Sequence, residues 1–177
     1  MTSRSFLAAA LATVLLATTV ALTPRLVAET LPDPTPSAAS GPLDGMVFSG
    51  VLGPADSPDH GIPDTLYFRN GHFWSEQCIP CGFRPGRYWV HQAADGIHFR
   101  GELSSPEGGT FKYAGVVRDD QVATTIDWRK ERWYWTIDRE FRFQGALSDD
   151  DSSLATLQDA QEAAISARQS GSTCKPD

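Results

Sequence analysis

Apolar and polar residues alternate with a period of two along most of the segment from Leu43 to Leu147. This pattern is typical of β-strands that bury one face and expose the other. It is longest from Arg132 to Leu147, where it continues for some fifteen residues and is interrupted by Arg139. We therefore expect a mostly antiparallel β domain with an aromatic interior.

The strongest turn signal is Asn70-Gly71, which separates two short runs of alternating residues. Asn and Gly both tolerate positive φ, as the central residues of a two-residue type I′ hairpin require. The resulting register places Phe68 opposite Phe73 and Tyr67 opposite Trp74.

A second hairpin is predicted at Asp95-Gly96 for the same reason. That register sets Gln92 opposite Phe99, and His91 opposite Arg100. Apolar side chains then share one face of the hairpin, and charged and histidine side chains share the other.

A third hairpin is predicted at Asp119-Asp120. Its register brings Lys112 opposite Asp127, which is a favourable cross-strand charge pair. The other face then pairs apolar residues throughout, in the order Phe111 with Trp128, Tyr113 with Ile126, and Val117 with Val122.

Together with an opening strand at Met46–Leu52, these segments give about eight strands in meander order. Eight antiparallel strands can close on themselves and so remove exposed edges. The predicted fold class is all-β, forming a small barrel or curled half-barrel, with a flat two-layer sandwich as the alternative. Residues Leu154–Arg168 are rich in Ala, Gln and Leu and predict a C-terminal helix.

The N-terminus reads as an export segment. A short basic start is followed by an uncharged apolar run from Ser5 to Leu22, as in signal peptides. Ala28 is the preferred cleavage point, and an uncleaved membrane anchor remains open because the run nearly reaches the length of a membrane span. Either way the β domain is expected outside the cytoplasm, periplasmic or secreted.

The expected domain organisation has four parts. Residues 1–28 form the signal peptide or N-terminal anchor, and residues 29–42 form a Pro-rich spacer. Residues 43–147 form the β domain. Residues 148–177 comprise an acidic linker, the short helix and a disordered tail.

The charge balance narrows the classes of partner. The formal net charge is −7, and it becomes more negative if the N-terminal segment with Arg4 and Arg25 is removed. Such a chain is repelled by phosphate backbones, so nucleic-acid binding is not expected.

Three cysteines occur, at Cys78, Cys81 and Cys174. Outside the cytoplasm thiols tend to oxidise, and a local Cys78–Cys81 disulfide is the preferred pairing. A bridge from either residue to Cys174 remains open. A redox or zinc role for the Cys78/Cys81 pair is the alternative, although the pair lies in a loop after a strand rather than at a helix start.

Candidate ligand-binding residues come from the aromatic rows of the last three strands. Arg139 stands in an otherwise apolar row and must be paired, or lie at the barrel mouth where a ligand anion could reach it. Paired with Glu102 or Asp127 it would be structural. The predicted binding set is Arg139, Trp133, Trp135, Trp128 and Tyr113.

Catalytic and metal motifs are not recognised. The chain has no nucleophile elbow, zinc-protease or phosphate-loop motif. His91 and His98 share a face but have Arg100 nearby, which disfavours a cation. No cofactor, metal or catalytic residue is therefore assigned.

The stretch Asp64–Leu147 resembles a group of exported bacterial proteins of unknown activity. The likeness lies in a DTLYF strand, a Cys-rich loop running into Gly82-Phe83, a strand bearing Tyr88, and Arg132-Trp133-Tyr134-Trp135. The order of signal peptide, meander barrel and helix also resembles lipocalins and related calycins. It departs from their Gly-x-Trp start, since this chain has Gly45-Met46-Val47.

These observations predict a non-catalytic envelope protein. Its β domain is expected to bind a small apolar or anionic molecule, or a protein partner. The lipocalin-like layout implies ligand carriage only by analogy of fold.

Overall fold

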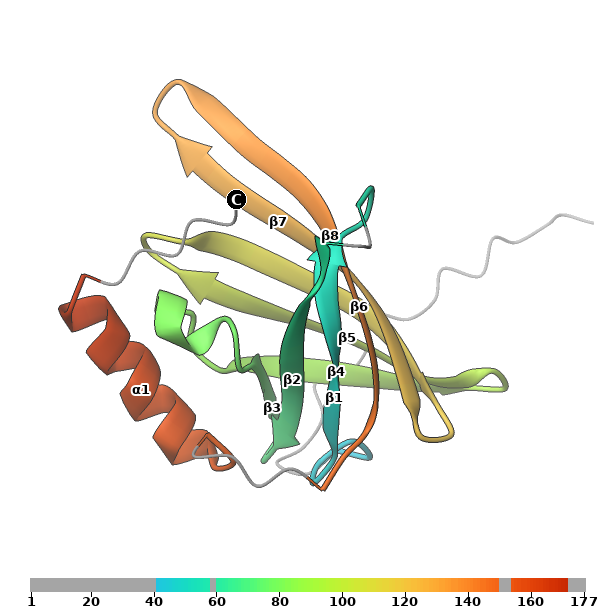
Figure 1. Cartoon of the computed structure of the whole chain (residues 1–177). Coiled ribbons are helices and arrows are strands. Elements are labelled where there is room, and N and C mark those ends of the chain that lie inside the picture. Colours follow the sequence, from blue (N-terminus) through green and yellow to red (C-terminus); the bar gives the residue numbers. More distant parts are fainter. Residues whose placement is uncertain (1–40, 58–59, 150–153, 172–177) are drawn as a thin grey trace, which may run out of the picture. The chain divides into compact units, whose positions relative to one another are not determined.

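The computed structural model describes residues 41–57, 60–149 and 154–171. Eight antiparallel strands close into a barrel, each paired with its neighbours in the chain and β8 with β1 (Figure 1). A helix, α1 (Leu157–Gln169), follows the barrel. The strands are β1 (Val47–Pro54), β2 (Ile62–Arg69), β3 (His72–Ser75), β4 (Gly86–Ala93), β5 (Gly96–Ser105), β6 (Gly109–Arg118), β7 (Gln121–Arg132) and β8 (Trp135–Leu147).

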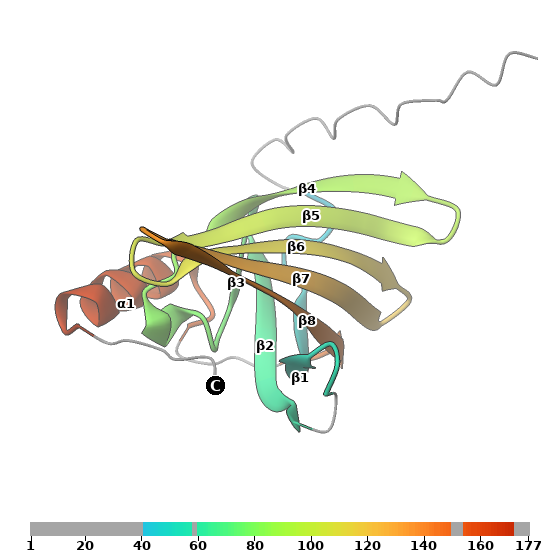
Figure 2. The same ribbon diagram turned by 90° about the horizontal axis from the view of Figure 1, so that it is seen from above.

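The barrel and the helix confirm the predicted all-β class with a C-terminal helix. The barrel is closed, which excludes the half-barrel and the sandwich. The predicted export segment, the spacer up to residue 40 and the end of the tail lie outside the described residues. Figure 2 shows β4 to β8 side by side along one wall of the barrel.

Two of the three predicted hairpin registers are confirmed. Phe68 pairs with Phe73 and Tyr67 with Trp74, and Asn70 has the positive φ (52°) that the turn needs. In the third hairpin Lys112 pairs with Asp127, as the charge pattern predicts.

The predicted register of the β4–β5 hairpin is wrong by two residues. Phe99 pairs with Val90 rather than Gln92, and His98 pairs with His91. Gly96 belongs to the strand with a φ of 139°, so the turn falls at Ala94 and Asp95. A slip of two keeps every side chain on its predicted face, so the alternation could not reveal it.

Aromatic rings fill the barrel interior. The ring of Phe68 has Tyr88 and Phe99 edge-on, both with centroids 5.1 Å away. Inward-facing glycines make room for such rings: a Cβ at Gly101 would lie 2.2 Å from the Phe73 ring. The buried inner cluster comprises Leu43, Phe48, Leu66, Phe68, Phe73, Cys78, Phe83, Tyr88, Phe99, Leu103, Tyr113, Val117, Val122, Ile126 and Phe143.

The segment before β1 covers one end of the barrel. Leu43 is completely buried there. The Asp44 carboxylate accepts hydrogen bonds from the Gly71 backbone N–H (3.0 Å) and from the Tyr88 hydroxyl (2.7 Å). These bonds join the chain before β1 to the β2–β3 turn and to β4, and so close this end.

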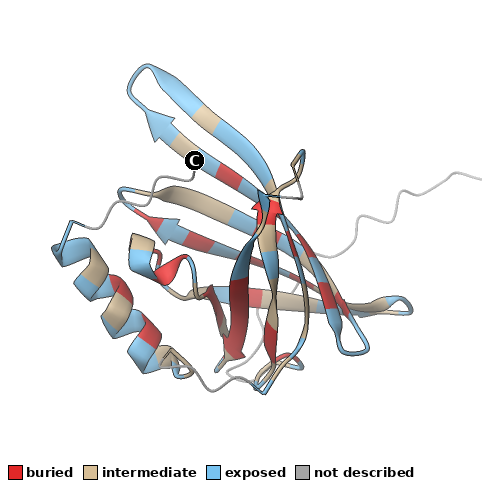
Figure 3. Ribbon diagram, in the orientation of Figure 1, coloured by how far each residue is buried: buried red, intermediate tan, exposed pale blue. Residues whose placement is uncertain are grey.

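Helix α1 covers an apolar patch on the outside of the barrel. Ala160 and Ala164 pack there with Tyr67, Trp74 and other outward residues, and burial alternates along α1 accordingly (Figure 3). The small alanine side chains allow the helix to approach closely. The hydroxyl of Thr156 caps the helix by accepting from the Asp159 backbone N–H.

A candidate ligand site at the barrel mouth

The β7–β8 hairpin is longer than its neighbours on either side. The last β7 residue paired with β6 is Arg129, and the first β8 residue paired with β1 is Phe141. Between them the two strands pair with each other, and at the edge of this stretch the Ala55 backbone N–H donates to the Glu140 carbonyl (3.0 Å). The hairpin therefore continues past the barrel as a two-stranded ribbon, with a mostly exposed end (Figures 1 and 3).

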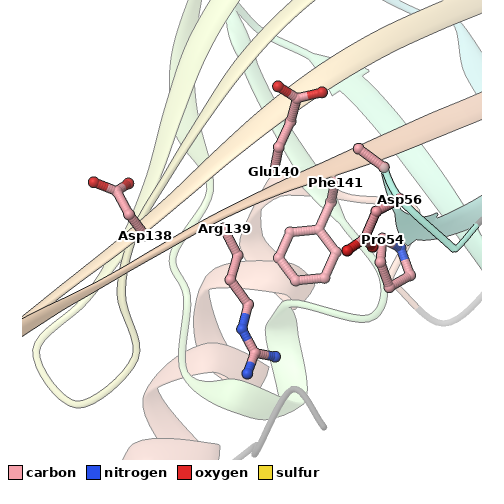
Figure 4. Close-up of a pocket in the computed structure, with 7 residues that line it drawn as sticks. Pro54, Asp56, Asp138, Arg139, Glu140 and Phe141 are labelled. Atoms are coloured by element: carbon pink, nitrogen blue, oxygen red, sulfur yellow. The ribbon is translucent and has the colours of Figure 1, made fainter.

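A cleft of about 700 Å³ lies where this ribbon leaves the barrel. β8 supplies one side, and the end of β1 with the following residues supplies the other. Figure 4 shows Arg139 and Phe141 on one side of β8, with Asp138 and Glu140 directed to the other. The lining residues are Pro54, Ala55, Asp56, Asp138, Arg139, Glu140 and Phe141.

Arg139 lies at the barrel mouth, which is one of the two positions predicted for it. Its cross-strand partner is Trp128, so it lies in the inward row of β8. It is exposed, and within the described residues no ion pair or hydrogen bond engages its guanidinium. The predicted alternative, pairing with Glu102 or Asp127, is therefore wrong: Asp127 lies in the outward row of β7, and Glu102 lies on β5, which does not neighbour β8.

Trp128 and Tyr113 lie deeper in the barrel and serve the core. Trp128 is 5% exposed, donates its indole N–H to the Gly108 carbonyl (2.8 Å) and stacks on Phe111. Tyr113 is also buried, with its hydroxyl 3.6 Å from the Cys78 sulfur. Of these two, only Trp128 comes near the mouth, through its pairing with Arg139.

The prediction that Trp133 and Trp135 belong to the barrel interior is wrong. Their exposed fractions are 92% and 52%. The physical reason is the ribbon: beyond Arg129 and before Phe141, no third strand from the described part of the chain pairs with it, so an inward row there has no sheet to pack against. The alternation of apolar and polar residues along one strand does not show where the adjacent strands end.

Phe141, Pro54 and Asp56 line the cleft but do not belong to the predicted binding set. Phe141 could have been found, because it lies two residues from Arg139 on the same face. Pro54 and Asp56 belong to the connection after β1, and only the closure of β1 against β8 brings them to the cleft.

The predicted Cys78–Cys81 disulfide is wrong, because Cys78 is a free, buried thiol. Burial raises its pKa to about 12, and the charge of nearby Asp64 adds to the rise. A thiol held neutral in this way is a poor nucleophile. Cys81 lies at the end of the short helix η2 (Ile79–Cys81), and Cys174 lies outside the described residues.

The buried Asp64 carboxylate organises the turn before η2. It accepts hydrogen bonds from the Ser75 hydroxyl (2.7 Å) and from the backbone N–H groups of Thr65 (2.8 Å) and Gln77 (3.0 Å). Burial raises its pKa to about 6, although these hydrogen bonds oppose the rise. The three partners come from β2, the end of β3 and the turn that follows it, so this cluster ties the loop to the sheet.

Within the described ranges, no group of three or more His, Cys, Asp or Glu residues is arranged to hold a metal ion. In the same part of the chain, no helix is long and apolar enough to cross a membrane. No family model, curated protein or solved structure matches this chain.

Proposed function

We propose that this protein is an exported, non-catalytic binding protein that holds a small amphiphilic anion at the mouth of its barrel. The observation that carries the proposal is the guanidinium of Arg139, unpaired within the described residues and lining a cleft beside Phe141. Arginine recognises carboxylates and phosphates through paired, charge-assisted hydrogen bonds. An apolar group on the same molecule would contact Phe141 and Pro54.

The filled interior limits the ligand to the mouth. Aromatic rings occupy the space between the strands, and Phe68, Phe73 and Phe99 are almost completely buried. A deep cavity of the kind that lipocalin-like barrels use is therefore not part of the proposal. The mouth cleft has a volume within the range of small-molecule sites.

The charges around the cleft favour one position for the anion. Asp56, Asp138 and Glu140 all line the cleft. The carboxylates of Asp138 and Glu140 point to the side of β8 opposite Arg139 (Figure 4), so Asp56 is the acid expected to repel an anion beside Arg139. An anionic group is therefore expected beside Arg139 and away from Asp56. The redox alternative for Cys78 and Cys81 loses support, because the Cys78 thiol is buried and its pKa is raised.

Binding of decanoate, measured by titration calorimetry, tests the proposal. Arg139→Gln should weaken binding by roughly tenfold, since it removes a charge-assisted hydrogen bond of about 1.5 kcal/mol. The matched control is Arg142→Gln, three residues along β8 on its outer face, whose ion-pair partner among the described residues is exposed Glu140 (3.4 Å). Asp56→Asn should tighten binding.

Decanol, which has the same chain without the charge, provides a second control. Decanol should bind the wild-type protein more weakly than decanoate does. Arg139→Gln should bind decanol and decanoate with equal affinity. Equal decanoate affinity in the wild-type protein and Arg139→Gln would contradict the proposal and leave a protein partner as the remaining occupant of the mouth.

A further inference from the structure

The tip of the β7–β8 ribbon, here called the hairpin tip (Arg132–Trp135), presents three consecutive aromatic residues to solvent. The exposed fractions of Trp133, Tyr134 and Trp135 are 92%, 68% and 52%. Their rings contact one another, with centroids 4.5 Å apart for Trp133 and Tyr134 and 6.1 Å for Tyr134 and Trp135. None of the three belongs to a buried cluster.

Folding does not explain this exposure. The two-stranded ribbon could end at Arg129 without loss of any barrel pairing, because β6 reaches no further. Contiguous exposed apolar side chains on a folded protein commonly mark a surface that contacts something else. Trp and Tyr are favoured where one side of the ring meets an apolar phase and the polar atom meets water.

The charge near the hairpin tip is opposite in sign to that of the chain. The segment from Arg129 to Arg139 contains four basic and two acidic residues, whereas the whole chain has a formal net charge of −7. Arg129 is engaged by Glu131 and Asp138, and Lys130 donates to the Glu107 carbonyl. Arg132 has no ion pair or hydrogen bond within the described residues.

We propose that the hairpin tip inserts its aromatic side chains into the interfacial layer of an anionic phospholipid membrane, with Arg132 against the lipid phosphates. Trp and Tyr prefer the headgroup region of bilayers. Cations beside a negatively charged leaflet strengthen attachment, by about fivefold for each residue. The acidic remainder of the chain is repelled by the same surface, so the charge distribution turns the tip toward it.

The protruding shape also favours a membrane over a protein. A ribbon end that extends past the barrel is convex and narrow, so it can penetrate a lipid interface. A protein partner would need a matching pocket to bury all three rings. The predicted export of the chain across a membrane supplies the setting, and this proposal does not depend on the ligand proposed for Arg139.

Depth-dependent quenching of tryptophan fluorescence by brominated lipids tests this inference in the full chain. The readout reports insertion of the tip itself, even if the N-terminal apolar segment also binds vesicles. Brominated vesicles containing phosphatidylglycerol should quench wild-type fluorescence. The quenching should be absent in the double variant Trp133→Ala/Trp135→Ala and preserved in Leu147→Ala, which alters an exposed apolar residue at the other end of β8.

The charge requirement is tested with Arg132→Gln against Arg100→Gln, which removes an exposed arginine on the outer face of β5. Arg132→Gln should lower the apparent affinity for the anionic vesicles by about fivefold, and Arg100→Gln should leave it unchanged. Absence of quenching in the wild-type protein would overturn the inference and indicate a protein partner for the tip. Equal quenching by vesicles of phosphatidylcholine alone would overturn the requirement for anionic lipid.

Discussion

The hydroxyl of Tyr88 donates a hydrogen bond to Oδ1 of Asp44 over 2.7 Å. The bond crosses the closed end of the barrel and joins β4 to the segment that precedes β1. Burial raises the pKa of Tyr88 well above its usual range, and the bonded carboxylate adds to the rise. Tyr88 should therefore stay protonated in the folded protein at moderately alkaline pH.

Tyr88→Phe is expected to lower the free energy of unfolding by about 1–2 kcal/mol, because hydrogen bonds to charged groups stabilise more than neutral ones. Urea denaturation measures the change. Tyr134→Phe, at an exposed position, should have almost no effect on stability. Equal stability of the wild-type protein and Tyr88→Phe would mean that water satisfies Asp44 equally well.

Stability should depend on pH through Asp64. Its pKa is raised from 3.8 to about 6 in the folded state, so folding favours the protonated form. The resulting stabilisation is complete below pH 3.8 and is lost as the pH rises through 6. The loss amounts to about 3 kcal/mol, at 1.36 kcal/mol for each pKa unit.

Asp64→Asn removes this titration. As the pH rises from 4 to 7, the wild-type protein should therefore lose unfolding free energy relative to Asp64→Asn. Asp127→Asn, which removes an exposed carboxylate on β7, serves as the control for the loss of a carboxylate as such. A flat difference for Asp64→Asn would show that Asp64 titrates normally.

Gly101→Ala is expected to destabilise the barrel by about 1–3 kcal/mol through overpacking. The added Cβ would lie 2.2 Å from the Phe73 ring, which is itself packed against Tyr113 (centroids 5.1 Å apart). Thermal unfolding measures the effect. Phe73→Leu in the same chain should restore part of the loss, and a failure of rescue would place the strain elsewhere.

Cys78 should resist alkylation in the native protein. Its thiol is buried and its pKa is raised to about 12, so iodoacetamide at pH 8 should modify it only after unfolding. Intact-mass measurement before and after denaturation distinguishes the two states. Rapid native alkylation of Cys78 would show that the loop carrying η2 opens readily.

The remaining cysteines are predicted to pair with each other. Cys78 is free, which leaves Cys81 and Cys174 to pair if the chain is exported as proposed, because thiols outside the cytoplasm tend to oxidise. Peptide mapping without reduction should therefore yield a Cys81–Cys174 cross-link. Recovery of Cys174 as an unmodified thiol from protein purified without reductant would contradict this pairing.

The sequence predicts the barrel well where turn chemistry and alternation agree. Asn70-Gly71 and Asp119-Asp120 fix their hairpins, because the turn sets the register and a slip of one would expose the core. At Asp95-Gly96 a register shift of two residues leaves the apolar and polar faces unchanged, and the turn falls one residue earlier, at Ala94 and Asp95. In α1 the buried contacts come from alanines rather than from Ile165, which is 42% exposed.

The candidate site is less predictable, because it depends on where strands lose their neighbours. Arg139 is recognisable as an exception in an apolar row, and its place at the mouth was one of two readings. Trp133 and Trp135 continue the same pattern beyond the last partner strand, where inward and outward faces are equivalent. Pro54 comes to lie opposite Phe141 only when β1, at the start of the meander, pairs with β8 at its end.

Aromatic rings of the interior pack directly against glycine backbone, and this arrangement determines how the barrel could be redesigned. Phe73 and Phe99 lie over the backbone of Gly101 and Gly115, so shortening either ring leaves a hollow whose glycine side has no side chain to refill it. Trimming Phe73 and Phe99 would therefore convert a solid β-barrel into a container, at a cost in stability comparable to other large-to-small core changes.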